Sequence, residues 1–216
     1  LGWLTFLVAL VVYSLTLEPS VSLWDCGEFI SASYKLQVVH PPGAPFFLLI
    51  GRLFAMFASD PTVVPIAVNM MSAVSSALTV LFTFWITTHF AKKMVKDTEE
   101  TANRIAIFGA GLVAALALTF MDSFWFSAVE AEVYAMSSLF TALTFWAALR
   151  WEESESQYAD KWLVLIAYLI GLAIGTHLLN LLVIPTVVFI YYFKKFTPSR
   201  KGMAYSFLAG LVILGF

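Results

Sequence analysis

The sequence has little charge, one cysteine and no excess of basic residues. Only 12% of its 216 residues are Asp, Glu, Lys or Arg, whereas a soluble domain carries about 25%. The net charge of −2 argues against the basic surface on which nucleic-acid binding depends, so we expect no nucleic-acid partner. Because Cys26 is the only cysteine, no disulfide can form within the chain.

Apolar residues dominate what is present. They make up 61% of the chain, with a mean hydropathy of +0.87, and several runs approach the roughly 20 residues that cross a bilayer as a helix. The sequence therefore predicts an all-α, polytopic membrane protein. We expect one transmembrane domain over 1–216, the N-terminal fragment of a larger protein. Its spans are predicted at about 1–17, 62–90, 105–121, 130–149, 163–175, 178–193 and 203–216, the last truncated.

The apolar run 163–193 has two interpretations. At about 31 residues it would measure roughly 46 Å as one helix, which is longer than a hydrocarbon core of about 30 Å. Gly175, Thr176 and His177 interrupt it midway. We expect two short spans joined by a tight hairpin, and one long helix is the alternative.

Basic residues indicate the orientation. Ten of the twelve lie in the linkers after the second, fourth and sixth spans, and such linkers are cytoplasmic by the positive-inside rule. Loop 18–61 then lies on the non-cytoplasmic side, as do seven acidic residues. We expect an integral protein of a bacterial inner membrane whose site faces the periplasm, or of the endoplasmic reticulum in a eukaryote.

Loop 18–61 contains a concentration of polar residues. Asp25 and Glu28 are spaced i, i+3, which places both carboxylates on one face of a helix. Pro41 and Pro42 end that helix, because proline lacks the backbone N–H and restricts the residue before it. Residues 46–58 are apolar but too short to span. The loop therefore predicts two short juxtamembrane helices.

Three segments of the sequence resemble a known family. The first reads WDCGEF followed by HPPGAP, and the others read FWFSAVEAEVYAMSSLF and GLAIGTHLLNLL. The order of these motifs resembles the C-type glycosyltransferases, such as the protein O-mannosyltransferases, which take a sugar from a polyprenyl-phosphate carrier. It most closely resembles a bacterial domain-of-unknown-function family, number twenty-seven twenty-three. An animal relative of that family O-mannosylates plexin-type receptor domains in the endoplasmic reticulum.

The resemblance implies a glycosyltransferase that moves a sugar, mannose, from polyprenyl phosphate to a Ser or Thr hydroxyl of a protein. Its partners are the lipid-linked donor, a protein acceptor and membrane lipid. Two alternatives from other classes stay open: a transporter or flippase of a lipid-linked substrate, and a non-catalytic scaffold of an envelope complex. An assay for glycosylated product separates the three.

Asp25 is the expected catalytic residue. Inverting transfer needs a general base that takes the proton of the acceptor hydroxyl, and Glu28 lies one turn further on as its catalytic partner. The alternative for Asp25 is a helix N-cap. The two carboxylates alone are a weak metal signal, because hard cations prefer more oxygen ligands. We expect no tightly bound cofactor, and a divalent metal requirement stays open.

Basic side chains in the same loop are candidates for the carrier's phosphate. They are Lys35, His40 and Arg52, whose positive charge would stabilise the leaving group. Each has a simpler alternative: Lys35 as a surface residue, His40 as a structural residue of the turn, and Arg52 as a side chain that extends toward lipid headgroups.

The later segments add polar residues on the same side of the membrane. Glu130 and Glu132 are candidate substrate-binding residues, although acids near the start of a span also interact favourably with the helix dipole. His177 and Asn180 lie at the break in the run 163–193. They are further substrate-binding candidates, or they satisfy backbone groups freed by the break.

Overall fold

The computed structural model describes residues 1–155 and 159–215, and every regular element within these ranges is helical. The elements are α1 (Gly2–Leu15), α2 (Cys26–Lys35), α3 (Pro45–Ala55), η1 (Pro61–Val63), α4 (Val64–Met94), α5 (Thr101–Thr119), α6 (Asp122–Ala128), α7 (Val133–Glu153), α8 (Asp160–Ile174), η2 (Leu178–Leu182), α9 (Val183–Lys195) and α10 (Arg200–Leu214). The predicted all-α class is confirmed.

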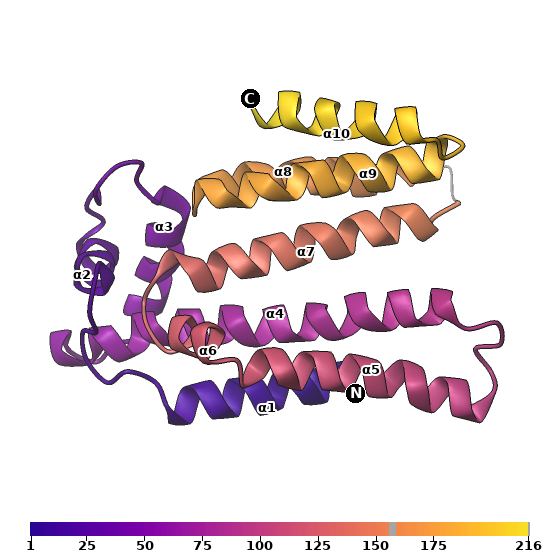
Figure 1. Cartoon of the computed structure of the whole chain (residues 1–216). Coiled ribbons are helices and arrows are strands. Elements are labelled where there is room, and N and C mark those ends of the chain that lie inside the picture. The colour runs from indigo at the N-terminus through magenta and orange to yellow at the C-terminus, as the bar shows by residue number, and fades with distance from the viewer. Residues whose placement is uncertain (156–158, 216) are drawn as a thin grey trace.

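The longer helices lie side by side in a bundle, and α2 and α3 lie together at one end of it (Figure 1). Helix α4 has 31 residues, about 46 Å at 1.5 Å per residue, and packs against α1, α5 and α7. Its contact face carries small residues, including Ala73, Ser76 and Ala77, all buried. Small side chains let helix backbones approach closely in a membrane.

Among the described residues, three helices are long and apolar enough to cross a membrane: Pro61–Met94, Thr101–Thr119 and Leu178–Lys195. The bent pair α6 and α7 adds a fourth if it counts as one span. Helix α1 has 14 residues, about 21 Å, which is less than the hydrocarbon core. The chain is thus an all-helical membrane protein, and the seven predicted spans stay a prediction.

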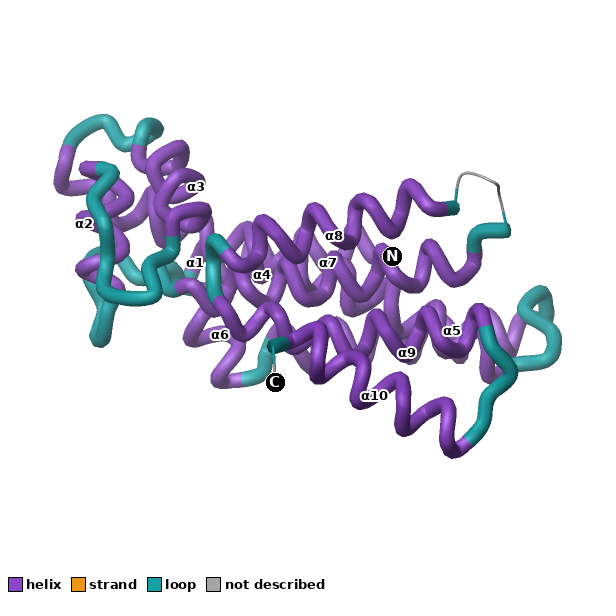
Figure 2. Tube along the Cα trace, turned by 90° about the horizontal axis from the view of Figure 1, so that it is seen from above, coloured by secondary structure: helices purple, strands orange, loops and turns teal. Residues whose placement is uncertain are grey.

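The chain interrupts its helical course between α8 and α9. Helix α8 ends at Ile174, and the short helix η2 begins at Leu178. The intervening Gly175 carbonyl accepts a hydrogen bond of 2.7 Å from the Phe46 N–H of α3. The break therefore lies against the end of the bundle that carries α2 and α3. After the break, α9 and α10 are neighbouring helices, as a second view shows (Figure 2).

Helices α2 and α3 pack closely on one another. A Cβ added to Gly51 of α3 would lie 2.4 Å from the Ser33 Oγ of α2, so glycine is needed at this contact. The rings of Phe29 and Phe47 meet edge to face, with centroids 5.1 Å apart. Helix α2 ends at Lys35, and the next residue, Leu36, lies in the left-handed region with φ of 50°. These contacts fix the turn that carries His40.

The sequence pattern did not predict α6. Helix α5 ends at Thr119, and α6 occupies only seven residues before α7 begins at Val133, bent from α6 by 109°. A helix of two turns is too short to produce a recognisable apolar period. Because of this bend, the link 129–132, with its two glutamates, lies outside both helices.

Candidate active site

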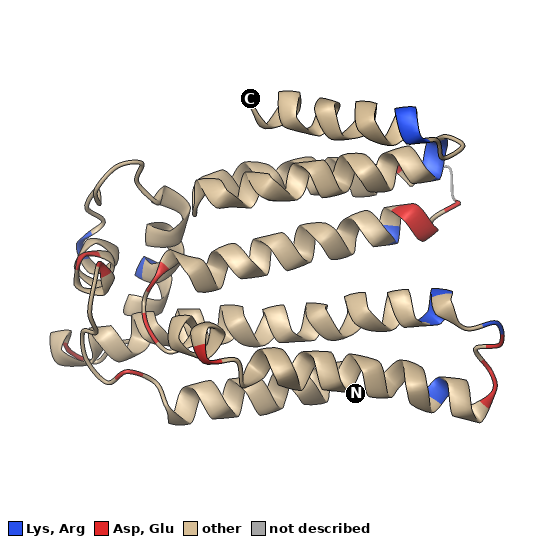
Figure 3. Ribbon diagram, viewed as in Figure 1, with Lys and Arg blue, Asp and Glu red and all other residues tan. Residues whose placement is uncertain are grey.

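Basic residues gather at one end of the bundle, and the charged residues of the other end are mainly acidic. Asp and Glu residues of α2 and of the link between α6 and α7 lie at the end formed by α2 and α3 (Figure 3). Lys and Arg lie mainly at the other end, together with further acids. The candidate residues of distant segments therefore meet at one end.

Asp25 lies at the N-cap position of α2 but does not cap it. Its side chain makes no capping hydrogen bond, and only its backbone carbonyl accepts from the Phe29 N–H, at 3.0 Å. The residue is exposed. The preceding Trp24 has φ of 63° and is 85% exposed. The Asp25 carboxylate is therefore available for chemistry.

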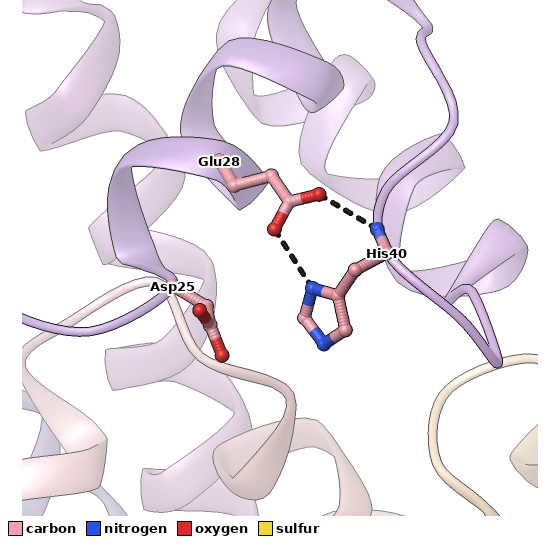
Figure 4. A group of neighbouring side chains, drawn as sticks. All are labelled: Asp25, Glu28 and His40. Carbon is pink, nitrogen blue, oxygen red and sulfur yellow. Dashed lines mark hydrogen bonds and ion pairs between the residues drawn. The ribbon is translucent and has the colours of Figure 1, made fainter.

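Glu28 holds the His-Pro-Pro turn. Its Oε1 accepts the His40 backbone N–H at 2.7 Å, and its Oε2 lies 2.7 Å from His40 Nδ1 (Figure 4). The hydrogen bond to Glu28 raises the pKa of His40 above its usual value, and the same bond lowers the pKa of Glu28. Because Nδ1 is engaged, Nε2 is the nitrogen left to meet a ligand.

Asp25, Glu28 and His40 could together hold a metal ion. One ligand atom of each lies within 4.8 Å of the others, and all three side chains are exposed. Two carboxylates and an imidazole suit a divalent cation that completes its shell with water. His40 adds a ligand to the pair of carboxylates that the spacing predicted.

Glu130 and Glu132 are buried beside α2, with exposed fractions of 4% and 5%. The Ser22 hydroxyl donates to Glu130 Oε2 at 2.5 Å, and Cys26 Sγ lies 3.7 Å from Glu132 Oε1. Burial raises the pKa of Glu132, and the charge of Asp25 raises it further. Burial likewise raises the pKa of Cys26, to about 12. These contacts tie the link 129–132 to the segment that carries Asp25.

Two neighbouring cavities share Asp25, Glu132 and Tyr134. The larger, of about 300 Å³, is also lined by Trp24, Phe126, Ser127 and Glu130. The smaller, of about 80 Å³, extends to His40, Thr176 and His177. Burial lowers the pKa of His177. Of the seven residues predicted beside Asp25 and Glu28, four thus line these cavities: His40, Glu130, Glu132 and His177.

Residues 25–200 match the family described as the protein O-mannosyl-transferase TMEM260 N-terminal domain. The chain belongs to this family. It is 29% identical over 199 residues, 84% of this chain, to "Protein O-mannosyl-transferase tmem260" of Dictyostelium discoideum. It is 28% identical over 213 residues, 93% of this chain, to "Protein O-mannosyl-transferase TMEM260" of Mus musculus.

The matched regions make up 22% and 28% of those two relatives, so the chain spans about a quarter of their length. No solved structure matches the chain. Membership of the O-mannosyltransferase family agrees with the resemblance in the three sequence segments. The bacterial family named there stays a prediction.

The other three predicted site residues line neither of these two cavities. Arg52 donates to the Tyr34 carbonyl at 2.5 Å, and its guanidinium lies 5.6 Å from the centre of the Tyr34 ring. Lys35 is exposed in the last turn of α2. Asn180 is 2% exposed and donates to the Ala173 and His177 carbonyls. Asn180 therefore satisfies the backbone at the helix break.

Ser22 and Cys26 were not predicted as residues of the site. Ser22 lies in the segment before α2 and Cys26 is the first residue of α2, and their Oγ and Sγ atoms lie 3.0 Å apart. Each also contacts one of the two buried glutamates. The sequence offers only the spacing as a signal, because the glutamates lie more than a hundred residues away.

Proposed function

We propose that this chain forms the part of a protein O-mannosyltransferase that carries its catalytic base, on a C-type glycosyltransferase fold. The enzyme transfers mannose from a polyprenyl-phosphate carrier to a Ser or Thr hydroxyl of a protein on the non-cytoplasmic face. The observation that carries the proposal is the meeting of Asp25 and Glu132 in two adjoining cavities at the acidic end of the bundle.

Asp25 is the general base of this mechanism. Its carboxylate takes the proton of the acceptor hydroxyl while the hydroxyl oxygen forms a bond to the anomeric carbon of the sugar. The bond between that carbon and the phosphate oxygen breaks, and the lipid phosphate leaves with the electron pair. The configuration of the sugar is inverted. An exposed carboxylate with no capping bond is suited to this role.

His40 faces the leaving phosphate. Its pKa is raised by Glu28, which favours the protonated imidazole, and that form offers a positive charge and an Nε2–H donor where negative charge develops. Arg52 is less suited, because its guanidinium is engaged by the carbonyl and ring of Tyr34. Glu28 acts through His40 in this assignment.

The larger cavity binds the sugar. Trp24, Phe126 and Tyr134 supply aromatic surface, and the buried Glu130 and Glu132 supply oxygen acceptors. Aromatic rings combine a flat apolar face with a rigid shape, which suits the less polar face of a hexose. The carboxylates accept hydrogen bonds from its hydroxyl groups.

The test is an assay of the full-length protein with the Asp25→Asn substitution. Polyprenyl-phosphate mannose and a Ser/Thr-containing acceptor domain are incubated with the enzyme, and mannosylated acceptor is measured. Loss of a general base lowers the rate by roughly 10²- to 10⁴-fold. Asp122→Asn is the matched control, because Asp122 is an exposed acid of α6 that is expected to leave the rate unchanged. Full activity of a folded Asp25→Asn enzyme would refute the mechanism.

A further inference from the structure

A second site lies at the basic end of the bundle, far from the candidate active site. A cavity of about 370 Å³ lies between the C-terminal turns of α4 and α7 and the start of α8. Each long helix lines it with one stripe of residues spaced by four and three positions. These are Trp85, His89 and Lys92 on α4, and Trp146, Arg150 and Glu153 on α7.

The stripes change from apolar to charged toward the end of the bundle. Lys92 lies seven residues after Trp85, about 10 Å along the helix axis, and Glu153 follows Trp146 by the same interval. The indole of Trp146 lies 5.7 Å from that of Trp85 and 5.8 Å from that of Trp162 on α8. The cavity thus has a tryptophan-lined depth and a charged mouth, which is the polarity order of an amphiphile at a membrane interface.

The carboxylate at the mouth is held in place by two partners. Glu153 Oε1 lies 3.0 Å from His89 Nδ1, and Glu153 Oε2 lies 2.7 Å from the Arg150 guanidinium. Lys93, beside this group, is paired with Glu152 at 2.6 Å. Lys92 also lines the cavity, and over residues 1–155 and 159–215 it forms no ion pair. The mouth therefore combines a fixed carboxylate with a free ammonium group.

We propose that this cavity binds the headgroup of a zwitterionic phospholipid, an aminoalkyl phosphodiester. Lys92 and Arg150 hold the singly charged phosphodiester, since charge-assisted hydrogen bonds to phosphate are strong. The lipid's ammonium group, the outermost part of the headgroup, lies beside the Glu153 carboxylate at the mouth. The glycerol and upper acyl chains lie against Trp85 and Trp146.

The charges at the mouth distinguish this ligand from related ones. A lipid with a second negative charge, or without the ammonium group, leaves Glu153 facing a neutral or negative headgroup. A free headgroup such as phosphoethanolamine gains the polar contacts but not the apolar contacts of the tryptophans. The site lies at the other end of the molecule from Asp25 and does not depend on the proposed transferase activity.

The experiment is native mass spectrometry of the full-length protein in detergent, titrated with phosphatidylethanolamine, phosphatidylglycerol or free phosphoethanolamine. The wild type is expected to retain phosphatidylethanolamine preferentially. Lys92→Ala and Trp146→Ala are each expected to raise its dissociation constant about tenfold or more, the effect of losing a charge-assisted contact or an aromatic wall. Lys195→Ala is the matched control, because Lys195 is an exposed lysine at the end of α9, at the same end of the bundle.

Several results would overturn the proposal. They are equal retention of the two lipids by the wild type, binding of free phosphoethanolamine as tight as that of the lipid, and an unchanged dissociation constant in both cavity variants. A polypeptide segment of the full-length protein found in the cavity also overturns it. The comparison of lipids on the wild type needs no variant, so it stays decisive even if Trp146→Ala unfolds.

Discussion

Removing the Ser22 hydroxyl should destabilise the protein markedly for so small a change. This hydroxyl donates to Glu130 Oε2 at 2.5 Å, and Glu130 is only 4% exposed. Ser22→Ala leaves a buried carboxylate oxygen without this donor. A hydrogen bond to a charged group contributes roughly 1.5–3 kcal/mol. The equilibrium constant for unfolding should therefore rise about 10- to 150-fold.

The measurement is the free energy of unfolding of the full-length protein in denaturant, followed by tryptophan fluorescence. Ser20→Ala is the matched control. Its hydroxyl donates to Glu18 Oε1 at 3.0 Å on the exposed surface, so its loss should stay within about 0.5 kcal/mol. Transfer activity should also fall in Ser22→Ala, because Ser22 ties the segment before Asp25 to the link 129–132. Equal free energies of unfolding for the two variants would refute this reasoning.

Three further predictions concern other contacts. The pKa of His40 is raised from 6.5 and that of Glu28 is lowered from 4.5. Their ion pair therefore contributes its stability between pH 4.5 and 6.5. This contribution is lost as the pH rises through the pKa of His40 or falls through the pKa of Glu28. Glu28→Gln should shift the NMR titration of the His40 ring to lower pH, and an unshifted midpoint contradicts the assigned pair. Asn180→Ala removes two donors and an acceptor from the buried helix break and should lower the melting temperature, at a cost of about 3 kcal/mol; a wild-type melting temperature would show that water replaces the amide. Gly51→Ala places a Cβ 2.4 Å from Ser33 Oγ and should lower the free energy of unfolding by roughly 1–3 kcal/mol. Gly109→Ala, on the open face of α5, should leave that free energy unchanged or raise it by up to ~1 kcal/mol. Thermal unfolding of both variants checks this contrast.

The first loop shows how far a local pattern reaches. Its prolines and its spacing of acids predicted a short helix, a turn and a second short helix, and α2 and α3 follow these signals. The spacing did not predict that Glu28 would hold His40, because that contact depends on how the turn folds back on α2. Arg52 is a second case: its position suggested a lipid phosphate, which stays a prediction, and the sequence pattern did not predict its contact with the Tyr34 carbonyl.

The link between α6 and α7 shows where local patterns stop. The sequence predicted Glu130 and Glu132 at the start of a span, where the helix dipole alone could account for them. In the structure the helix begins at Val133, about three residues after the predicted start, and both side chains are buried against the segment of Ser22 and Cys26. A contact across a hundred residues of chain leaves no local period to detect.

The sequence by itself determined the helical class, the membrane character and the concentration of basic residues in alternate linkers. Apolar run length, scarcity of charge and the position of lysines and prolines act locally, so they can be read along the chain. Only the tertiary structure decided which polar residues meet. The bend between α6 and α7, the close contact at Gly51 and the break at Gly175 set the positions of whole helices, and those positions bring Asp25, His40, Glu132 and His177 to one pair of cavities.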